Sequence, residues 1–197
     1  MKIVGVSQRM EFLHERNETR DSLDQRLVEF ISECGALAVP IPNILSGSKG
    51  ALDQWLRVIN PSAFVLSGGS DIGSCDMRDN LEQSLLNHAS YNSMPVLGIC
   101  RGMQMIGIWA GCKLKSIKGH VKTYHILRGR LEGRVNSYHG KSLMSTTSDF
   151  EILARSEDGE VEAISHVTLP WEGWMWHPER EKQFSPRDID RLSELLS

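Results

Sequence analysis

The first 110 residues alternate short apolar runs with segments of helical length, and this alternation limits the fold more than any other feature. Apolar runs with the length of buried strands lie at 2–8, 36–41, 63–67 and 95–99. Segments that favour helix lie between them at 23–34, 51–59 and 80–91. Strands connected through helices run parallel and are covered on both faces. The pattern therefore predicts an α/β fold, a three-layer sandwich around a mostly parallel central sheet.

Two local signals refine this prediction. Ser22-Leu-Asp-Gln25 has the pattern of a capping box for the first helix, and the polar stretch before it is expected to be a solvated loop. After about Lys113 the alternation ends. Segments 150–155 and 161–166 flank a turn signature and predict a hairpin, 174–177 predicts another strand, and Ser185-Pro186 starts a last helix. The second half should therefore add antiparallel or mixed strands to one domain spanning 1–197.

Composition excludes several classes of protein. Of the 197 residues, 40% are hydrophobic and 24% charged, and no apolar run approaches the roughly 18 residues that a membrane helix needs. The formal net charge of −3 argues against a nucleic-acid partner. The four cysteines form no Cys-x-x-Cys pair, and the first residues lack a secretory signal. We expect a cytoplasmic protein with reduced thiols and no membrane partner.

The segment Gly98-Ile-Cys100-Arg-Gly102 has the spacing of a nucleophile elbow, with cysteine as the nucleophile. In an elbow a strand ends, the nucleophile occupies a strained turn, and a helix begins at once. Glycines two residues before and after it let the neighbouring backbone approach. The helix N-terminus favours a thiolate at Cys100, and the amide of Arg101 is placed to bind an oxyanion. By itself the motif is equally consistent with a tight turn around a buried thiol.

Two further motifs favour catalysis. Gly68-Gly69 follows an apolar strand, and consecutive glycines there can present amide N–H groups to an anion. In Trp176-His177-Pro178-Glu179, an extended backbone would direct His177 and Glu179 to the same side, so that the carboxylate orients the imidazole. A thiol nucleophile needs such an oriented base. The sequence therefore predicts a catalytic triad of Cys100, His177 and Glu179.

These motifs, together with Asn136-Ser-Tyr-His139, resemble in type and order the class I glutamine amidotransferase-like family, and most of all its γ-glutamyl hydrolase branch. The resemblance covers nearly the whole chain and implies a flavodoxin-like fold. It implies that Cys100 attacks a γ-glutamyl carbonyl to give a thioester, that His177 transfers protons, and that water then releases glutamate. The oxyanion would be bound by the amides of Gly69 and Arg101. No cofactor and no metal is expected.

The resemblance also assigns substrate-binding positions, which are Gly68, Gln104, Asn136, Ser137, Tyr138 and His139. Tyr138-His139-Gly140 stands where many members of the branch carry His-His-Gln. The distal part of the substrate site is therefore expected to differ from that of typical members.

The leaving group is suggested by a basic stretch. Residues 113–134 contain seven Lys or Arg and one acidic residue, and they should border the active-site mouth. Lys118, His120 and Lys122 are candidate phosphate-binding residues; the alternative is a solvated surface segment. A metal site at His120 and His125 is disfavoured because no third ligand has suitable spacing. Short members of the branch of this kind resemble γ-glutamyl-CDP-amidate hydrolases, which release cytidine diphosphoramidate for capsule modification.

Two alternatives remain at this stage. The chain could be a glutaminase subunit that supplies ammonia to a partner synthetase, since no synthetase domain accompanies the predicted hydrolase fold. It could also be a non-catalytic binding or thiol-sensing protein that uses Cys100 as a reactive group. The substrate under the main hypothesis is a small γ-glutamyl compound, nucleotide-linked forms included.

Overall fold

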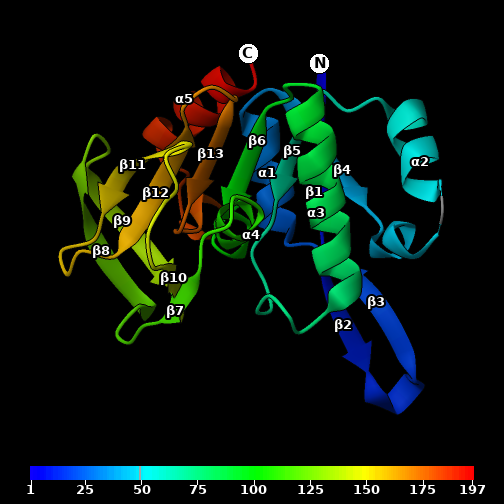
Figure 1. Cartoon of the computed structure of the whole chain (residues 1–197), viewed down its shortest axis with the longest axis horizontal. Coiled ribbons are helices and arrows are strands. Elements are labelled where there is room, and N and C mark those ends of the chain that lie inside the picture. Colours follow the sequence, from blue (N-terminus) through cyan, green and yellow to red (C-terminus); the bar gives the residue numbers. More distant parts are fainter. Residues whose placement is uncertain (49) are drawn as a thin grey trace.

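The computed structural model describes residues 1–48 and 50–197, which form a nine-stranded sheet covered by helices (Figure 1). The order across the sheet is β4-β1-β5-β6-β13-β12-β11-β8-β9. The strands in that order are β4 (Ala36–Ile41), β1 (Lys2–Ser7), β5 (Ala63–Leu66), β6 (Val96–Ile99), β13 (Trp171–Trp174), β12 (Val161–His166), β11 (Phe150–Arg155), β8 (Val121–Gly129) and β9 (Gly133–Tyr138).

The sheet has a parallel half and an antiparallel half that meet at β13. Pairing is parallel from β4 through β1, β5 and β6 to β13, and antiparallel from β13 through β12, β11 and β8 to β9. Buried runs such as Phe64–Leu66 and Val96–Ile99 fit strands that are covered on both faces. The predicted mixed addition is therefore an extension of the central sheet itself.

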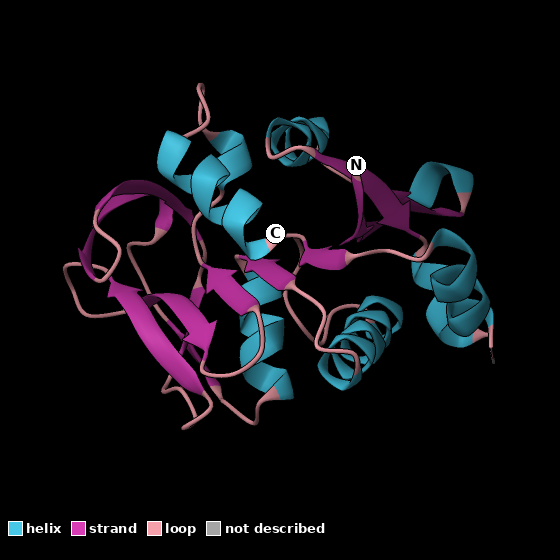
Figure 2. Cartoon of the chain, turned by 90° about the horizontal axis from the view of Figure 1, so that it is seen from above, coloured by secondary structure: helices cyan, strands magenta, loops and turns pink. Residues whose placement is uncertain are grey.

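Helices cover both faces of the sheet and make three layers (Figure 2). On one side, α1 (Gln25–Glu33) and α5 (Pro186–Leu195) contribute Leu27, Phe30 and Leu192 to one apolar cluster. On the other, α2 (Ala51–Ile59), α3 (Asp76–Tyr91) and α4 (Arg101–Trp109) contribute residues such as Leu85 and Met103 to a second cluster. The predicted α/β three-layer sandwich is confirmed.

Two small hairpin-like sheets lie outside the main one. The first pairs β2 (Arg9–Leu13) with β3 (Glu18–Ser22) around the short helix η1 (His14–Arg16), and it projects from the body in Figure 1. The expectation of a loop in this region was wrong, because the polar segment folds back on itself as a hairpin. The second pairs β7 (Leu114–Ser116) with β10 (Lys141–Leu143).

Some predicted boundaries were wrong. Ser22 belongs to β3, and the first helix is instead capped by Asp24, whose carboxylate accepts a hydrogen bond from Arg26 N. Helix α3 begins at Asp76, four residues before the predicted start. The predicted strand at 174–177 lies at Trp171–Trp174 and is followed by the short helix η3 (Pro178–Arg180). A further short helix, η2, spans Asn43–Gly47. Among the described residues, no helix is long and apolar enough to span a membrane.

Candidate active site

Cys100 lies at the turn between β6 and α4, as the elbow spacing predicts. Its φ and ψ of 52° and −103° place a non-glycine residue in a strained conformation, directly before the first helical residue, Arg101. A Cβ added to Gly102 would lie 2.1 Å from the carbonyl oxygen of Leu66 on the neighbouring strand β5. A Cβ added to Gly98 would lie 2.5 Å from the backbone of Gly102. Both glycines therefore permit the close packing on which the elbow depends.

His177 and Glu179 form a buried pair in the segment that follows β13. The Nδ1 atom of His177 lies 2.6 Å from Oε1 of Glu179, and the two residues are 2% and 3% exposed. The predicted contact exists, but the backbone argument for it was wrong. His177 precedes η3, so a tight helical turn, and not an extended strand, brings the carboxylate beneath the imidazole.

The environment of His177 favours its charged form. Burial lowers the pKa of His177, but hydrogen bonds with Cys100 and Glu179, and the negative charges of these two groups, raise it to about 9. Because Glu179 contacts Nδ1, Nε2 is the ring nitrogen that remains for the Cys100 thiol. The arrangement can therefore support a thiolate paired with an imidazolium.

The backbone of His177 is fixed by Asn136 of β9. The amide N–H of His177 donates to Asn136 Oδ1 at 2.9 Å, and Asn136 Nδ2 donates to the carbonyl of His177 at 2.7 Å. Asn136 Nδ2 also donates to Glu181 Oε1 at 2.7 Å. The side chain of Asn136 thus positions the base, and its predicted role in substrate binding stays a prediction.

The glycine loop after β5 lies beside His177, as its predicted function requires. A Cβ on Gly68 would lie 2.5 Å from Cε1 of His177, so only glycine fits between the loop and the ring. Gly69 has a φ of 143°, which favours glycine. The first amide of a helix, here that of Arg101, has no acceptor within its own helix. The amides of Gly69 and Arg101 are thus suitable donors for an oxyanion.

Arg78 of α3 orients this loop, a role that no sequence motif indicates. Its Nη2 donates to the carbonyl oxygens of Ser67 at 2.6 Å and of Gly68 at 3.0 Å. In a trans peptide the carbonyl and the next N–H point in opposite directions. By holding the Gly68 carbonyl, Arg78 directs the Gly69 N–H away from α3.

Arg78 belongs to a buried network of four charges beneath the loop and the elbow. Glu82 accepts from Arg78 Nε at 2.9 Å and from Ser7 Oγ at 2.8 Å, and it also pairs with the guanidinium of Arg101. Asp79 pairs with the same guanidinium. Two cations face two anions, so each buried charge has a partner, as burial of charge requires.

Two predicted substrate-binding residues, Tyr138 and Gln104, lie near the triad and differ in how exposed their side chains are. The Tyr138 ring is 5.8 Å from the His177 ring, edge to face, and carries the Arg180 guanidinium at 4.5 Å. Since Tyr138 is 37% exposed, it can contact a ligand. Gln104 is 4% exposed, and its Nε2 donates to the carbonyl of Lys141 at 3.1 Å. Its amide is therefore bound to the first residue of β10.

Ser137 and His139 do not present their side chains to the triad. Ser137 is fully buried, and its hydroxyl donates to the carbonyl of His120 at 2.7 Å. His139 is 2% exposed and lies with its ring 4.9 Å from that of His120. The His139 side chain is therefore directed into the protein, and the role of this position in substrate binding stays a prediction. Successive residues along and just after β9 point to opposite faces of the sheet, and the His139 side chain points to the buried face.

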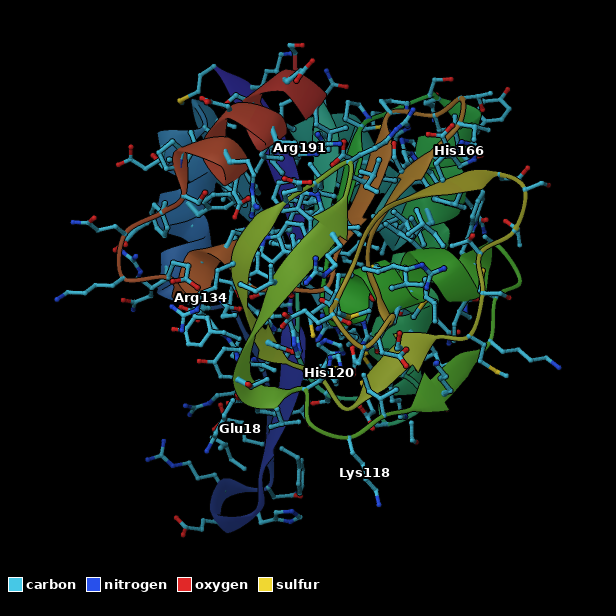
Figure 3. All side chains as sticks on the ribbon, turned by 90° about the vertical axis from the view of Figure 1, so that its left-hand side faces the viewer. Glu18, Lys118, His120, Arg134, His166 and Arg191 are labelled. Carbon is cyan, nitrogen blue, oxygen red and sulfur yellow. The ribbon has the colours of Figure 1, made fainter. Side chains whose placement is uncertain are left out.

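The three candidate phosphate-binding residues are not brought together as one site. His120 is 1% exposed, whereas Lys118 and Lys122 are exposed. Figure 3 shows Lys118 extending outward while His120 lies among the strands. Elsewhere in the basic stretch, Lys115 pairs with Glu160 and Arg130 pairs with Glu151. Part of the positive charge is therefore neutralised locally.

A narrow cavity lies on the side of His177 that faces α1. Its lining includes Arg9, Leu27, Gly68, His177 and Arg180, and its volume is about 10 Å³. This space accommodates about one water molecule.

A model of the class I glutamine amidotransferase family matches residues 19–191. The chain belongs to the class I glutamine amidotransferase family. Its fold is similar to that of a glutamine amidotransferase from Thermotoga maritima, which superposes with a TM-score of 0.66 at 18% identity, covering 98% of this chain and 81% of that one. The predicted family is therefore confirmed, and with it the enzyme class, a hydrolase that acts on carbon–nitrogen amide bonds.

Two curated relatives point to different roles within this glutamine amidotransferase family. The chain is 29% identical to the γ-glutamyl-CDP-amidate hydrolase of Campylobacter jejuni over 141 residues, 68% of this chain and 70% of that protein. It is 31% identical to one subunit of the glutamine-hydrolysing GMP synthase of Pyrococcus abyssi over 136 residues, 63% of this chain and 69% of that protein. The first relative supports the predicted γ-glutamyl hydrolase branch.

Proposed function

We propose that the protein hydrolyses a γ-glutamyl amide bond with Cys100 as nucleophile, His177 as the general acid and base, and Glu179 as the residue that orients His177. The proposal depends above all on the placement of His177, which contacts Glu179 through Nδ1 and has its pKa raised by the thiol of Cys100. A base held between a carboxylate and a thiol is the arrangement that nucleophilic catalysis requires.

The chemical steps follow from this arrangement. The Cys100 thiolate adds to the γ-glutamyl carbonyl, and the negative oxygen is bound by the amides of Gly69 and Arg101. The carbon–nitrogen bond then breaks as the His177 imidazolium gives its proton to the leaving nitrogen, which leaves a glutamyl thioester. Neutral His177 next takes a proton from water as the water attacks the thioester. Glutamate departs, and the thiolate and the imidazolium are restored.

The best specific substrate is a γ-glutamyl-CDP-amidate, for which the product beside glutamate is cytidine diphosphoramidate. The similarity to the Campylobacter jejuni hydrolase supports this choice. The exposed ammonium groups of Lys118 and Lys122 are available for electrostatic attraction of such an anion. Capsule modification and a cytoplasmic location follow from this substrate and remain predictions.

Comparison of three substrates tests the assignment. The enzyme is assayed for glutamate release from γ-glutamyl-CDP-amidate, glutamine and γ-glutamyl-aminobutyrate. We expect the nucleotide compound to have the highest kcat/KM. Charge reversal by Lys118→Glu with Lys122→Glu should raise KM for the nucleotide substrate and leave KM for glutamine unchanged. Equal kcat/KM for all three compounds would show the specific assignment to be wrong.

A glutaminase subunit is the second candidate, supported by the similarity to a subunit of a GMP synthase. Such a subunit has low glutaminase activity alone and is stimulated by its synthetase. Glutamine hydrolysis is therefore measured with and without a partner synthetase and its substrates. Strong stimulation favours this candidate, whereas full activity of the isolated chain favours the hydrolase.

A thiol-sensing role makes a different prediction from both enzymes. An active-site-directed γ-glutamyl chloroketone should label Cys100 and abolish activity in equal measure, and Cys100→Ser should be inactive. Cys34 serves as an internal control, because burial raises the pKa of its thiol to about 11 and makes it unreactive near neutral pH. Hydrolysis that persists in Cys100→Ser would exclude the proposed nucleophile.

A further inference from the structure

Four side chains in the antiparallel half of the protein converge on one buried point. They are His120, His125, His139 and Glu162, called here the histidine cluster, and one nitrogen or oxygen of each lies within 4.8 Å of the corresponding atom of every other. His120 directly precedes β8, His125 lies in β8, His139 directly follows β9, and Glu162 lies in β12. Figure 3 shows the position of His120 among these strands.

The atoms that converge lack hydrogen-bond partners. Within the described residues 1–48 and 50–197, no partner exists for His120 Nδ1, His125 Nε2, His139 Nε2 or either carboxylate oxygen of Glu162, all of which are buried. Glu162 is fully buried. A buried carboxylate without a donor costs several kcal/mol. A bound cation that accepts these lone pairs would remove this cost.

In His139 and His120, the ring nitrogen that faces away from the cluster has a hydrogen-bond acceptor beside it. The other ring nitrogen faces the cluster and can donate a lone pair. His139 Nδ1 lies 3.0 Å from the carbonyl oxygen of Lys141, which can only accept, so in a neutral ring Nδ1 carries the proton and Nε2 presents a lone pair to the cluster. His120 Nε2 lies 2.8 Å from Asp158 Oδ2, which leaves Nδ1 facing inward in the same way. A carboxylate or carbonyl behind the histidine is the usual environment of a metal ligand.

Two separations in the histidine cluster match tetrahedral zinc, and all the others lie within 4.8 Å. Ligands about 2.0–2.1 Å from a tetrahedral Zn²⁺ lie about 3.3–3.4 Å from one another. Glu162 Oε1 is 3.4 Å from His120 Nδ1 and 3.4 Å from His139 Nε2. These separations exceed the 2.7–2.9 Å of charged hydrogen bonds, so Glu162 makes no close hydrogen bond with either ring.

We propose that the histidine cluster is a Zn²⁺ site with three imidazole ligands and one carboxylate ligand. Four protein ligands close the coordination sphere, which is characteristic of a structural site. The ion joins β8, the segment after β9, and β12. Since β9 also carries Asn136, which holds the backbone of His177, the ion stabilises the strand that positions the proposed general base.

Metal analysis of the full chain tests the site without reference to activity. The protein carries no affinity tag, is purified without chelators, and has its metals measured by plasma mass spectrometry, as isolated and after incubation with Zn²⁺ and gel filtration. We expect about one zinc per chain. His125→Ala should lose it, whereas the matched control His14→Ala, on the exposed β2–β3 hairpin, should retain it. Asp158→Asn should weaken zinc affinity about 10- to 100-fold.

X-ray absorption at the zinc edge decides between this site and Cys100 with His177. The histidine cluster gives only nitrogen and oxygen neighbours at about 2.0–2.1 Å, whereas ligation by Cys100 adds sulfur at about 2.3 Å. Spectra of wild type and Cys100→Ala should be identical. This measurement uses the folded protein and holds even if His125→Ala does not fold. Sulfur ligation, no bound zinc after incubation, or unchanged zinc in a folded His125→Ala would overturn the proposal.

Discussion

Replacing Glu179 by glutamine tests the coupling between the carboxylate and the imidazole. Glutamine has the same shape and can still accept from His177 Nδ1, so the change removes mainly the negative charge. Raising the pKa of buried His177 from 6.5 to about 9 corresponds to roughly 3 kcal/mol of preference for the imidazolium. Both Cys100 and Glu179 contribute to this preference. We expect the pKa of His177 to fall by about 1, on the order of 1.4 kcal/mol, in Glu179→Gln.

The assay is a histidine titration by NMR with ¹⁵N-labelled protein, in which the His177 signals are assigned by their loss in His177→Gln. Glutamate release is measured in parallel, and kcat/KM should fall about 10²- to 10⁴-fold, because the base loses its orienting charge. Glu151→Gln is the matched control, since Glu151 pairs with Arg130 at the surface. A pKa for His177 still near 9 in Glu179→Gln would falsify the assigned coupling, and unchanged kcat/KM would remove Glu179 from the mechanism.

Three further outcomes follow from the site. Arg78→Lys should lower kcat at least about 10-fold with little change in KM, because an ammonium lacks the planar fork that contacts the loop carbonyls and Glu82 together, and the oxyanion forms only in the transition state. Steady-state kinetics measures this, and a selective rise in KM would contradict it. Gly102→Ala places a Cβ against the Leu66 carbonyl and should destabilise the fold by about 3 kcal/mol, roughly 6–12 °C in Tm, whereas Gly47→Ala, which has open space, should change Tm little. Because the folded pKa of His177 lies above 6.5, the stability that its imidazolium contributes is fully present below pH 6.5 and is lost as the pH rises through about 9. The values of kcat/KM and Tm, measured over a pH series, should therefore decline together near pH 9. A profile that stays flat to about pH 10 would refute the assignment.

The parallel half of the fold was predictable because its information is local. Apolar runs and helical spacing define each strand and helix by themselves, and Gly98, Cys100 and Gly102 define the elbow within five residues. The extension was harder to predict. Strands β8 and β9 pair across a short turn, but they carry cationic and aromatic residues on their exposed face. Their sequences therefore show no clear alternation of apolar and polar residues.

The missed functional groups depend on tertiary contacts. Arg78 lies in the first turn of α3 without a recognisable motif, and only its contacts with the glycine loop reveal its role. The histidine cluster combines residues from separate strands, so its spacing along the chain resembles no metal motif. The triad contact between His177 and Glu179 was predictable because its two members lie two positions apart in the chain, although the local backbone differs from the one assumed.

The position of β13 at the junction of the two halves has a consequence for how distant changes reach the active site. Cys100 N donates to the carbonyl of Trp174 at 2.7 Å, so the nucleophile is tied to the strand that leads to the base. On its other edge β13 pairs with β12. A substitution in the antiparallel strands that tilts β13 therefore alters the distance between the Cys100 sulfur and the His177 imidazole. Such a substitution would change the rate of proton transfer although it contacts neither residue.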